Sequence, residues 1–173
     1  MKGERAYIGI GSNLGDRIDH CQQAIRAISC APWATAMRVS SLYETAPVPP
    51  ASGGRFVNGV VSVETTLPPE ALLQELLRIE RVMGRAAARK RGEDRSIDLD
   101  LLLVDSRVVE RPDFVLPHPR MHQRRFVLVP LCELAPDLRH PLLGITMRAL
   151  LERLDDPSPV RLLARAVMPA PTG

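Results

Sequence analysis

The segment of residues 96–104, S-I-D-L-D-L-L-L-V, limits more than any other what this chain can fold into. Apolar and acidic residues alternate up to Asp100, and four apolar residues then follow without a break. Strand side chains point alternately to the two faces of a sheet, and an unbroken apolar run is typical of a strand that is buried on both faces. We therefore expect a buried central strand with Asp98 and Asp100 on one face. The other face would carry Ile97, Leu99, Leu101 and Leu103.

Asp98 and Asp100 are candidate metal ligands. Neighbouring positions on one face of a strand lie ~6.5–7 Å apart, and two carboxylates at that distance repel each other unless a cation lies between them or one is protonated. Mg²⁺ prefers carboxylate oxygens and usually keeps waters and substrate phosphates as its other ligands. The alternative is that both residues are charges that protect a sheet edge from pairing with another chain. The four apolar residues that follow favour the metal site.

The rest of the chain predicts the order strand, helix, strand, strand, helix, strand. The strands are expected at residues 5–10, 37–43, 56–64 and 96–104, and the helices from Asp16 to about residue 30 and from Pro68 to Gly84. Asn58-Gly59 also suits a hairpin turn. A hairpin would leave only two strand residues after the Pro- and Gly-rich loop 45–55, so we expect one strand there.

This order of elements is that of a ferredoxin-like split βαβ sandwich of the α+β class. After the last strand of this core, Asp105-Ser106 would turn the chain into a short partner strand at residues 107–109. Two extra C-terminal helices are expected at residues 126–134 and 146–154. The helices of the core would cover one face of the sheet and leave the other face open for a ligand.

Composition favours one globular domain. The chain has 173 residues, 45% of them hydrophobic and 25% charged, so we expect a single domain over residues 1–173 whose last ~10 residues form a loose tail. A net charge of +3 is too small to indicate bulk nucleic-acid binding. Neither a secretory signal, a membrane span nor paired cysteine spacing is evident. These features favour a reduced, cytoplasmic protein.

The loop before the acidic strand is rich in groups that bind phosphate: Arg85, Arg89, Lys90, Arg91 and Arg95. Beside carboxylate-bound Mg²⁺, arginines would stabilise charge on a transferring phosphate. For any single one of these residues the alternative is a solvated surface charge. Arg95, three residues before Asp98, is the strongest candidate.

Other residues are candidates for ligand contact. His118 lies between two prolines, and Arg124 follows shortly after it, which would suit a phosphate-contacting loop; the alternative is a loop histidine that is simply exposed to solvent. Phe56 and Phe126 border polar segments, so they either pack in the core or clamp a flat ring. Asn58 is disfavoured in mid-strand by propensity, and its amide would read the hydrogen-bonding edge of such a ring unless it forms a turn or bulge.

Taken together, these residues resemble the 6-hydroxymethyl-7,8-dihydropterin pyrophosphokinase family of folate biosynthesis. The resemblance covers roughly the whole chain. Its most specific part combines R-x-I-D-L-D-L-L at residues 95–102 with P-H-P-R-M at residues 117–121. Further matching stretches are Y-I-G-I-G-S-N-L-G at 7–15, S-S-L-Y-E-T at 40–45, F-V-N at 56–58, R-I-E at 78–80, G-R at 84–85, R-R-F at 124–126 and P-L-C-E-L-A-P at 130–136.

The resemblance implies a ferredoxin-like monomer that uses ATP and two Mg²⁺ ions, transfers a pyrophosphoryl group to the pterin's hydroxymethyl oxygen and releases AMP. Asp98 and Asp100 would hold both metals, and Arg85 and Arg95 would act with them in catalysis. The implied pterin contacts are Thr45, Ala46, Val48, Phe56, Asn58, Asp98 and Phe126. The implied ATP contacts are Glu80, Arg95, His118 and Arg124.

Two functions of other classes remain as alternatives. A ferredoxin-like RNA-binding module needs aromatic residues on its central strands and a basic sheet face, whereas here that strand would present Asp98 and Asp100, which repel phosphates in the absence of a metal. A metal-dependent nuclease would use the same pair of aspartates.

Overall fold

The computed structural model describes residues 3–47, 53–84 and 96–165 of the 173-residue chain. Its main sheet has the strand order β5-β1-β4-β3-β8, with β2 also paired to β4, and β6 and β7 form a separate two-stranded sheet. The strands are β1 (Glu4–Ser12), β2 (Thr35–Val39), β3 (Leu42–Thr45), β4 (Phe56–Thr65), β5 (Asp98–Val104), β6 (Val109–Arg111), β7 (Phe114–Leu116) and β8 (Val160–Ala164). The helices are α1 (Arg17–Ser29), α2 (Pro69–Val82), the short 3₁₀ helix η1 (Met121–Gln123), α3 (Arg125–Leu134) and α4 (Met147–Arg153).

The strand pairing confirms the ferredoxin-like core. β1 pairs antiparallel with both β4 and β5, and β2 and β3 pair antiparallel with β4. Asn58 and Gly59 lie within the continuous strand β4, opposite Gly11 and Ile10 of β1, so the single-strand prediction is confirmed and the hairpin is excluded.

The starts of α1 and α4 and the end of α2 follow local capping chemistry. The Asp16 side chain accepts a hydrogen bond from the Asp19 amide (3.0 Å) at the start of α1, and the Thr146 side chain accepts one from Ala149 (3.3 Å) at the start of α4. Each bond satisfies a backbone donor that the first helical turn leaves unpaired. After α2, Gly84 adopts a φ of +89°, a left-handed conformation that stops a helix at little cost for glycine.

The expectation of a central position for residues 98–104 is wrong, because β5 forms one end of the sheet. The strand is nevertheless buried from Leu101 to Val104. Part of its outer edge is paired, since the His118 amide donates a hydrogen bond to the Leu102 carbonyl (2.9 Å). The apolar run therefore reflects burial of both faces and not a place between two strands.

The predicted alternation along β5 holds only for its first half. Ile97, Leu99 and Leu101 belong to the core beneath α1 and α2, as expected, but Leu103 belongs to the core on the opposite face. The pairing with β1 shifts register between Tyr7 and Ile8, and such a bulge moves the following side chains to the other face.

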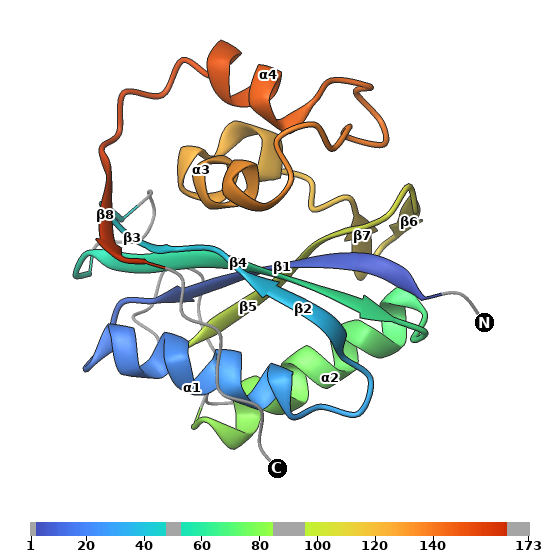
Figure 1. The fold of residues 1–173 in the computed structure, drawn as a ribbon, viewed down its shortest axis with the longest axis horizontal. Helices are drawn as coiled ribbons and strands as arrows, with labels where there is room; N and C mark the ends of the chain where they lie inside the picture. Colours follow the sequence, from blue (N-terminus) through green and yellow to red (C-terminus); the bar gives the residue numbers. More distant parts are fainter. Residues whose placement is uncertain (1–2, 48–52, 85–95, 166–173) are drawn as a thin grey trace.

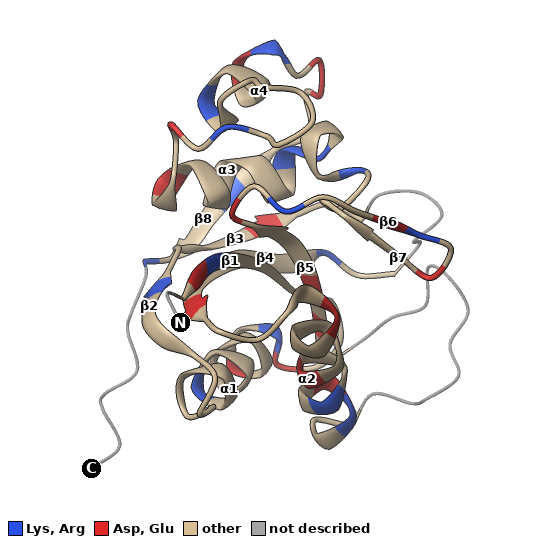
Figure 2. Ribbon diagram, turned by 90° about the vertical axis from the view of Figure 1, so that its right-hand side faces the viewer, with Lys and Arg blue, Asp and Glu red and all other residues tan. Residues whose placement is uncertain are grey.

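Two layers of helices enclose the sheet. α1 and α2 lie on one face, and α3 with α4 lies on the other (Figure 1), an arrangement that Figure 2 shows from the side. The core under α3 includes Leu128 and Leu131, both fully buried, together with Tyr7 and Val60 of the sheet. The expectation that the second face lies open for a ligand along its whole length is therefore wrong. The C-terminal helices cover much of it.

Three further strand predictions need correction. Residues 37–43 form two strands, β2 and β3, separated at Ser40-Ser41, and Thr45 ends β3 instead of opening a loop. The strand after the Asp105-Ser106 turn is β6, which pairs with β7 and not with β5. β8 was not expected at all, and it pairs with β3 along the edge of the sheet. In the part of the chain that the structure describes, no helix has the length and apolar character needed to span a membrane.

Candidate functional site

Gly9 and Gly11 of β1 form a strip without side chains, the glycine strip, between β5 and Asn58 of β4. Gly11 of β1 pairs with Asp98 on one side and with Asn58 on the other, and Gly9 pairs likewise with Asp100 and Val60. A Cβ at Gly11 would lie 3.0 Å from Asn58 Oδ1, closer than real Cβ contacts allow without a shift. The absence of a side chain at Gly11 thus lets the Asn58 amide lie against β1, where Gly11 is buried and Gly9 is partly exposed.

Asp98 and Asp100 lie on the same face of β5, as predicted, and each is paired with a glycine of the strip on β1. Both are partly exposed, whereas Leu99 between them is 3% exposed and packs in the opposite core. No group of three or more candidate metal ligands lies among residues 3–47, 53–84 and 96–165. Two carboxylates facing one way fit Mg²⁺, which takes few protein ligands and fills its remaining positions with water and phosphate oxygens.

The predicted pterin contacts Thr45 and Asn58 lie together. Asn58 Nδ2 donates a hydrogen bond of 2.7 Å to Thr45 Oγ1, and both side chains are buried. Phe56 pairs with Thr45 across β3 and β4 and is partly exposed. Ala46 is exposed, and Val48 lies outside the described residues. The bond to Thr45 fixes the orientation of the Asn58 amide, so its Oδ1 faces Gly11.

His118 lies beside the outer edge of β5. Its backbone amide bonds to Leu102, and its ring Nδ1 accepts a hydrogen bond from the Arg120 amide (3.2 Å). Burial, followed by the charges of Arg124 and Arg120, lowers the pKa of His118 to about 4. The ring is therefore neutral at pH 7, and since Nδ1 accepts, the proton lies on Nε2.

Arg124 and Phe126 stand at the start of α3. The Arg124 guanidinium lies over the Phe126 ring, 5.6 Å from its centroid, a cation–π arrangement. Phe126 is partly buried against the core beneath α3. Arg124, Phe126 and His118 thus belong to one continuous segment that lies against β5 and the sheet.

Glu80 occupies a different environment from the other predicted residues. It is 1% exposed, and its Oε1 accepts a hydrogen bond of 2.7 Å from the Leu99 amide. Leu99 separates the two aspartates, so Glu80 holds from α2 the peptide segment that carries them. Arg85 and Arg95 lie outside the described residues.

Two carboxylates that sequence reasoning missed organise β3. Glu133 of α3 accepts hydrogen bonds from the Ser41 amide and hydroxyl and from the Tyr43 hydroxyl. Burial and the bond to Glu133 raise the pKa of Tyr43 to about 12, so this phenol remains a donor. Glu44 forms ion pairs with arginines of three other segments. Neither partnership joins residues that are close in sequence, so no local spacing indicates it.

The fold and the site together define a class: a ferredoxin-like α+β protein with a carboxylate pair suited to a divalent cation. A family model described as 7,8-dihydro-6-hydroxymethylpterin-pyrophosphokinase (HPPK) matches residues 7–136. The chain belongs to this family. It is an enzyme, a diphosphotransferase that transfers a pyrophosphoryl group in folate biosynthesis.

Curated relatives agree with this assignment. The chain is 41% identical over 136 residues to the 2-amino-4-hydroxy-6-hydroxymethyldihydropteridine pyrophosphokinase of Haemophilus influenzae, covering 79% of this chain and 84% of the relative. It is 41% identical over 138 residues to the enzyme of the same name from Pseudomonas aeruginosa, covering 80% and 85%.

Solved structures share the fold. A crystal structure described as HPPK-DHPS in complex with substrates matches with a TM-score of 0.68 and 14% identity. The match covers 87% of this chain and 43% of that chain, so the present chain spans less than half of the matched protein. A Plasmodium falciparum HPPK-DHPS structure with pterin and p-hydroxybenzoate matches with a TM-score of 0.68 and 15% identity, over 88% of this chain and 42% of that chain.

Proposed function

We propose that this chain carries out its reaction at the strip between β5 and Asn58, with ATP and 6-hydroxymethyl-7,8-dihydropterin as substrates and AMP as the second product. The observation that carries the proposal is the register that aligns Asp98, Gly11 and Asn58 across three adjacent strands. Adjacent strands lie ~4.8 Å apart, so a flat ring on Gly11 would have a carboxylate at one edge and an amide at the other.

Two Mg²⁺ ions would be held by Asp98 and Asp100 and by the phosphates of ATP. The ions supply charge neutralisation to the triphosphate, as divalent cations do in phosphoryl transfer. The support is the shared orientation of both carboxylates and the Glu80 bond to Leu99, which fixes the backbone between them.

The pterin would lie between Phe56 and Phe126 and would be read along its edge by Asn58 and Thr45. Asn58 and Thr45 support this placement because their mutual hydrogen bond orients the amide before any ligand arrives, which lowers the cost of ordering it on binding. Ala46, Val48 and Asp98 complete the proposed set of pterin contacts.

The nucleotide would be contacted by His118, Arg124 and Arg95, and Glu80, which is 1% exposed, would act by holding the Leu99 amide behind the two aspartates. His118 supports this role because its neutral ring has Nε2–H as a donor, and Arg124 because it supplies a fixed positive charge. The substrate hydroxyl would attack the β-phosphorus in line, and Arg85 and Arg95 would stabilise the charge that develops on the transferring group.

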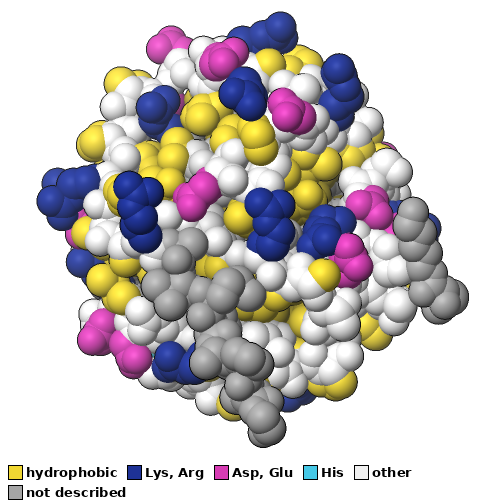
Figure 3. All heavy atoms as spheres, viewed as in Figure 1, with side chains coloured by type: hydrophobic (Ala, Val, Ile, Leu, Met, Phe, Trp, Pro, Cys, Tyr) yellow, Lys and Arg dark blue, Asp and Glu magenta, His cyan; other side chains and the backbone are white. Residues whose placement is uncertain are grey.

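The reaction products test the proposal. With ATP, Mg²⁺ and the hydroxymethyl dihydropterin, the purified chain should accumulate AMP and the pterin pyrophosphate, whereas an ordinary kinase would release ADP. Cleavage or binding of RNA without any turnover of this substrate pair would favour the nuclease or the RNA-binding module. On the face seen in Figure 3, basic side chains are interspersed with acidic and apolar ones, so this face does not offer the basic surface that an RNA-binding module needs.

We further propose that the enzyme works as a monomer in the cytoplasm. Its three cysteines, Cys21, Cys30 and Cys132, are free, which fits a reducing compartment. Sedimentation of the active enzyme at its assay concentration should give a single species of 19.1 kDa.

A further inference from the structure

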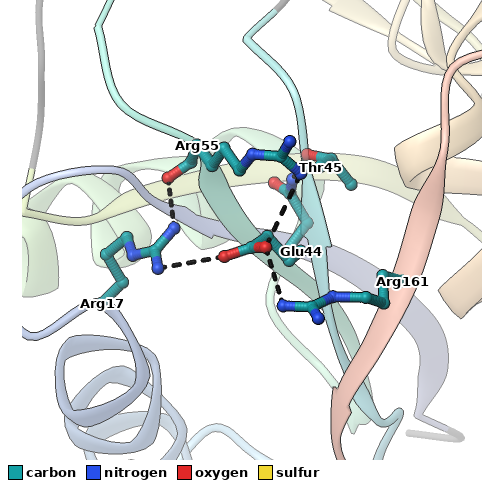
Figure 4. A network of polar contacts seen from close by, with 6 residues as sticks. Arg17, Glu44, Thr45, Arg55 and Arg161 are labelled. Carbon is teal, nitrogen blue, oxygen red and sulfur yellow. Dashed lines mark hydrogen bonds and ion pairs between the residues drawn. The ribbon is translucent and has the colours of Figure 1, made fainter.

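Glu44 is the centre of a cluster that ties together four segments of the chain (Figure 4). Its Oε2 lies 3.1 Å from Arg17 Nη2, and its Oε1 lies 3.0 Å from Arg161 Nη2 and 3.7 Å from Arg55 Nη1. Arg17 also donates from Nη1 to the Arg55 carbonyl (2.6 Å). The start of α1, the end of β3, the start of β4 and strand β8 therefore meet at one carboxylate.

The cluster lies beneath the proposed pterin contacts. Glu44 pairs with Val57, which packs in the core under α1, whereas its neighbour Thr45 points to the opposite face. Along the chain Glu44 precedes Thr45, and Arg55 precedes Phe56. Thr45 and Phe56 face each other across β3 and β4, so the cluster fixes the backbone of both residues from below.

The negative charge of Glu44 balances the positive charges of the three arginines around it. Only 11% of the Glu44 side chain is exposed, and three guanidinium groups converge on it. Burial alone would raise the pKa of Glu44, but hydrogen bonds and charges from Arg17 and Arg161 outweigh it and lower the pKa below its usual value. Without the negative charge, three like charges would face one another and the segments would separate.

We infer that Glu44 is a positioning residue for the pterin part of the site, acting through Thr45 and Phe56 and not by contact with a substrate. The inference rests on the proposed function. Strand β8 takes part in this positioning, because Arg161 lies directly opposite Glu44 in the β3–β8 pairing. The ion pairs of the cluster join α1, β3, β4 and β8, whereas His118 lies beside β5 and Arg124 at the start of α3, so the nucleotide contacts should not depend on the cluster.

Steady-state kinetics of Glu44→Gln test the inference. The KM for the pterin should rise about tenfold, while the KM for ATP and kcat stay within about twofold of the wild type. Glu44→Asp, which keeps the charge, should recover most of the pterin affinity. Glu64→Gln is the matched control. Glu64 lies near the far end of β4 and is paired to one arginine, Arg5, and its loss should leave both KM values unchanged.

A second variant tests the inference even if Glu44→Gln fails to fold. Arg161 is 69% exposed, so Arg161→Met should fold, and it should raise the KM for the pterin about threefold. An unchanged pterin KM in the folded Glu44→Gln and Arg161→Met enzymes would overturn the inference, as would parallel increases in the KM values of both substrates.

Hydrogen exchange separates this inference from the proposed function. In the substrate-free Glu44→Gln enzyme, amides of residues 43–46 and 55–58 should exchange faster, and those of α2 and α3 should not change. A wild type that forms no AMP from the pterin and ATP would refute the proposed function, and the exchange experiment would still decide whether Glu44 holds these two segments. Unchanged exchange in both segments would refute the positioning role.

Discussion

Asp98 and Asp100 are the residues on which the proposed chemistry depends most directly. Replacing either one with Asn preserves the shape of the side chain and removes one negative charge from the pair. Since Mg²⁺ binds carboxylate oxygens in preference to neutral amides, we expect Asp98→Asn and Asp100→Asn each to lower kcat by at least a hundredfold.

The measurement is AMP formation at saturating ATP over a range of Mg²⁺ concentrations. Both side chains are partly exposed, so the thermal unfolding temperature should fall little, and circular dichroism of each variant checks this. A variant with an unchanged Mg²⁺ dependence and wild-type turnover would remove that aspartate from the metal site.

Gly11 offers a test at the scale of one methyl group. In Gly11→Ala the new Cβ would meet Asn58 Oδ1 at 3.0 Å, and the Asn58 amide would have to shift by a few tenths of an ångström, which would disturb its orientation against Thr45. We expect the KM for the pterin to rise about tenfold or more, measured by AMP formation at saturating ATP.

Gly9→Ala is the matched control on the same strand and face. A Cβ at Gly9 would meet only Leu102 side-chain atoms, at 3.6 Å or more, which is ordinary van der Waals contact. Because alanine loses less backbone entropy than glycine on folding, this variant should be as stable as the wild type or more stable by about 0.5 kcal/mol. Equal losses of pterin affinity in both variants would show that the strip tolerates no Cβ at all, and the specific role given to Asn58 would be wrong.

At the scale of elements, the loop between α3 and α4 carries a pH-sensitive contact. His140 is 4% exposed, its Nδ1 accepts hydrogen bonds from the Leu142 and Leu143 amides (3.3 Å each), and its ring meets that of His122 edge to face at 5.6 Å. Burial, with a smaller contribution from the charge of His122, lowers the pKa of His140.

The sign of the pH effect follows from this direction. In the unfolded chain a histidine binds its proton near pH 6.5, before the folded chain does, so the neutral ring contributes stability above about pH 6.5 that is lost as pH falls below it. We expect the unfolding temperature to drop between pH 7.5 and pH 5.5, and to drop less in His140→Asn, whose side chain can still accept from the following amides. Identical pH slopes in the two proteins would contradict this account.

The elements differ in how far the sequence predicts them. α2 and β4 follow from local periodicity and capping residues, and the paired aspartates follow from alternation in β5. The edge position of β5, the break at Ser40-Ser41 and the docking of β8 on β3 depend on contacts between distant segments, such as those of Glu133 with β3 and of Arg161 with Glu44. Spacing along the chain carries no information about such pairs.

The same distinction applies to the site. Asp98, Asn58 and Thr45 were predicted separately, and only the register of β1 against β4 and β5 places Asp98 on one side of the strip and Asn58, with Thr45, on the other. The Leu103 error has a physical cause of the same kind, since one bulge in the pairing of β1 with β5 reverses the face of the residues that follow.

At the scale of the whole molecule, one sheet separates two apolar cores. Leu76 of α2 is fully buried in the core beneath α1 and α2, and Leu128 of α3 is fully buried in the core on the other face. Truncation of a fully buried leucine to alanine costs about 2–5 kcal/mol. Because both cores share the strands between them, we expect Leu76→Ala and Leu128→Ala each to lower the stability of the entire chain by this amount.

Denaturant unfolding followed by two probes checks this prediction. Far-ultraviolet circular dichroism and the fluorescence of Trp33, which packs against the first core, should report the same midpoint in both variants. A Leu128→Ala enzyme in which the Trp33 signal keeps its wild-type midpoint, while helix content is lost earlier, would show that the α3–α4 layer unfolds independently.

The glycine strip on β1 has a consequence for resistance to inhibitors. A compound resting there would contact peptide groups of Gly9 and Gly11, and peptide groups cannot be removed by point mutation. A substitution that adds a side chain at one of these positions would block such a compound. At Gly11 the added side chain would also shift the Asn58 amide, on which binding of the natural substrate is expected to depend. A resistance mutation at Gly11 would thus lower folate synthesis, whereas one at Gly9 would leave Asn58 in place.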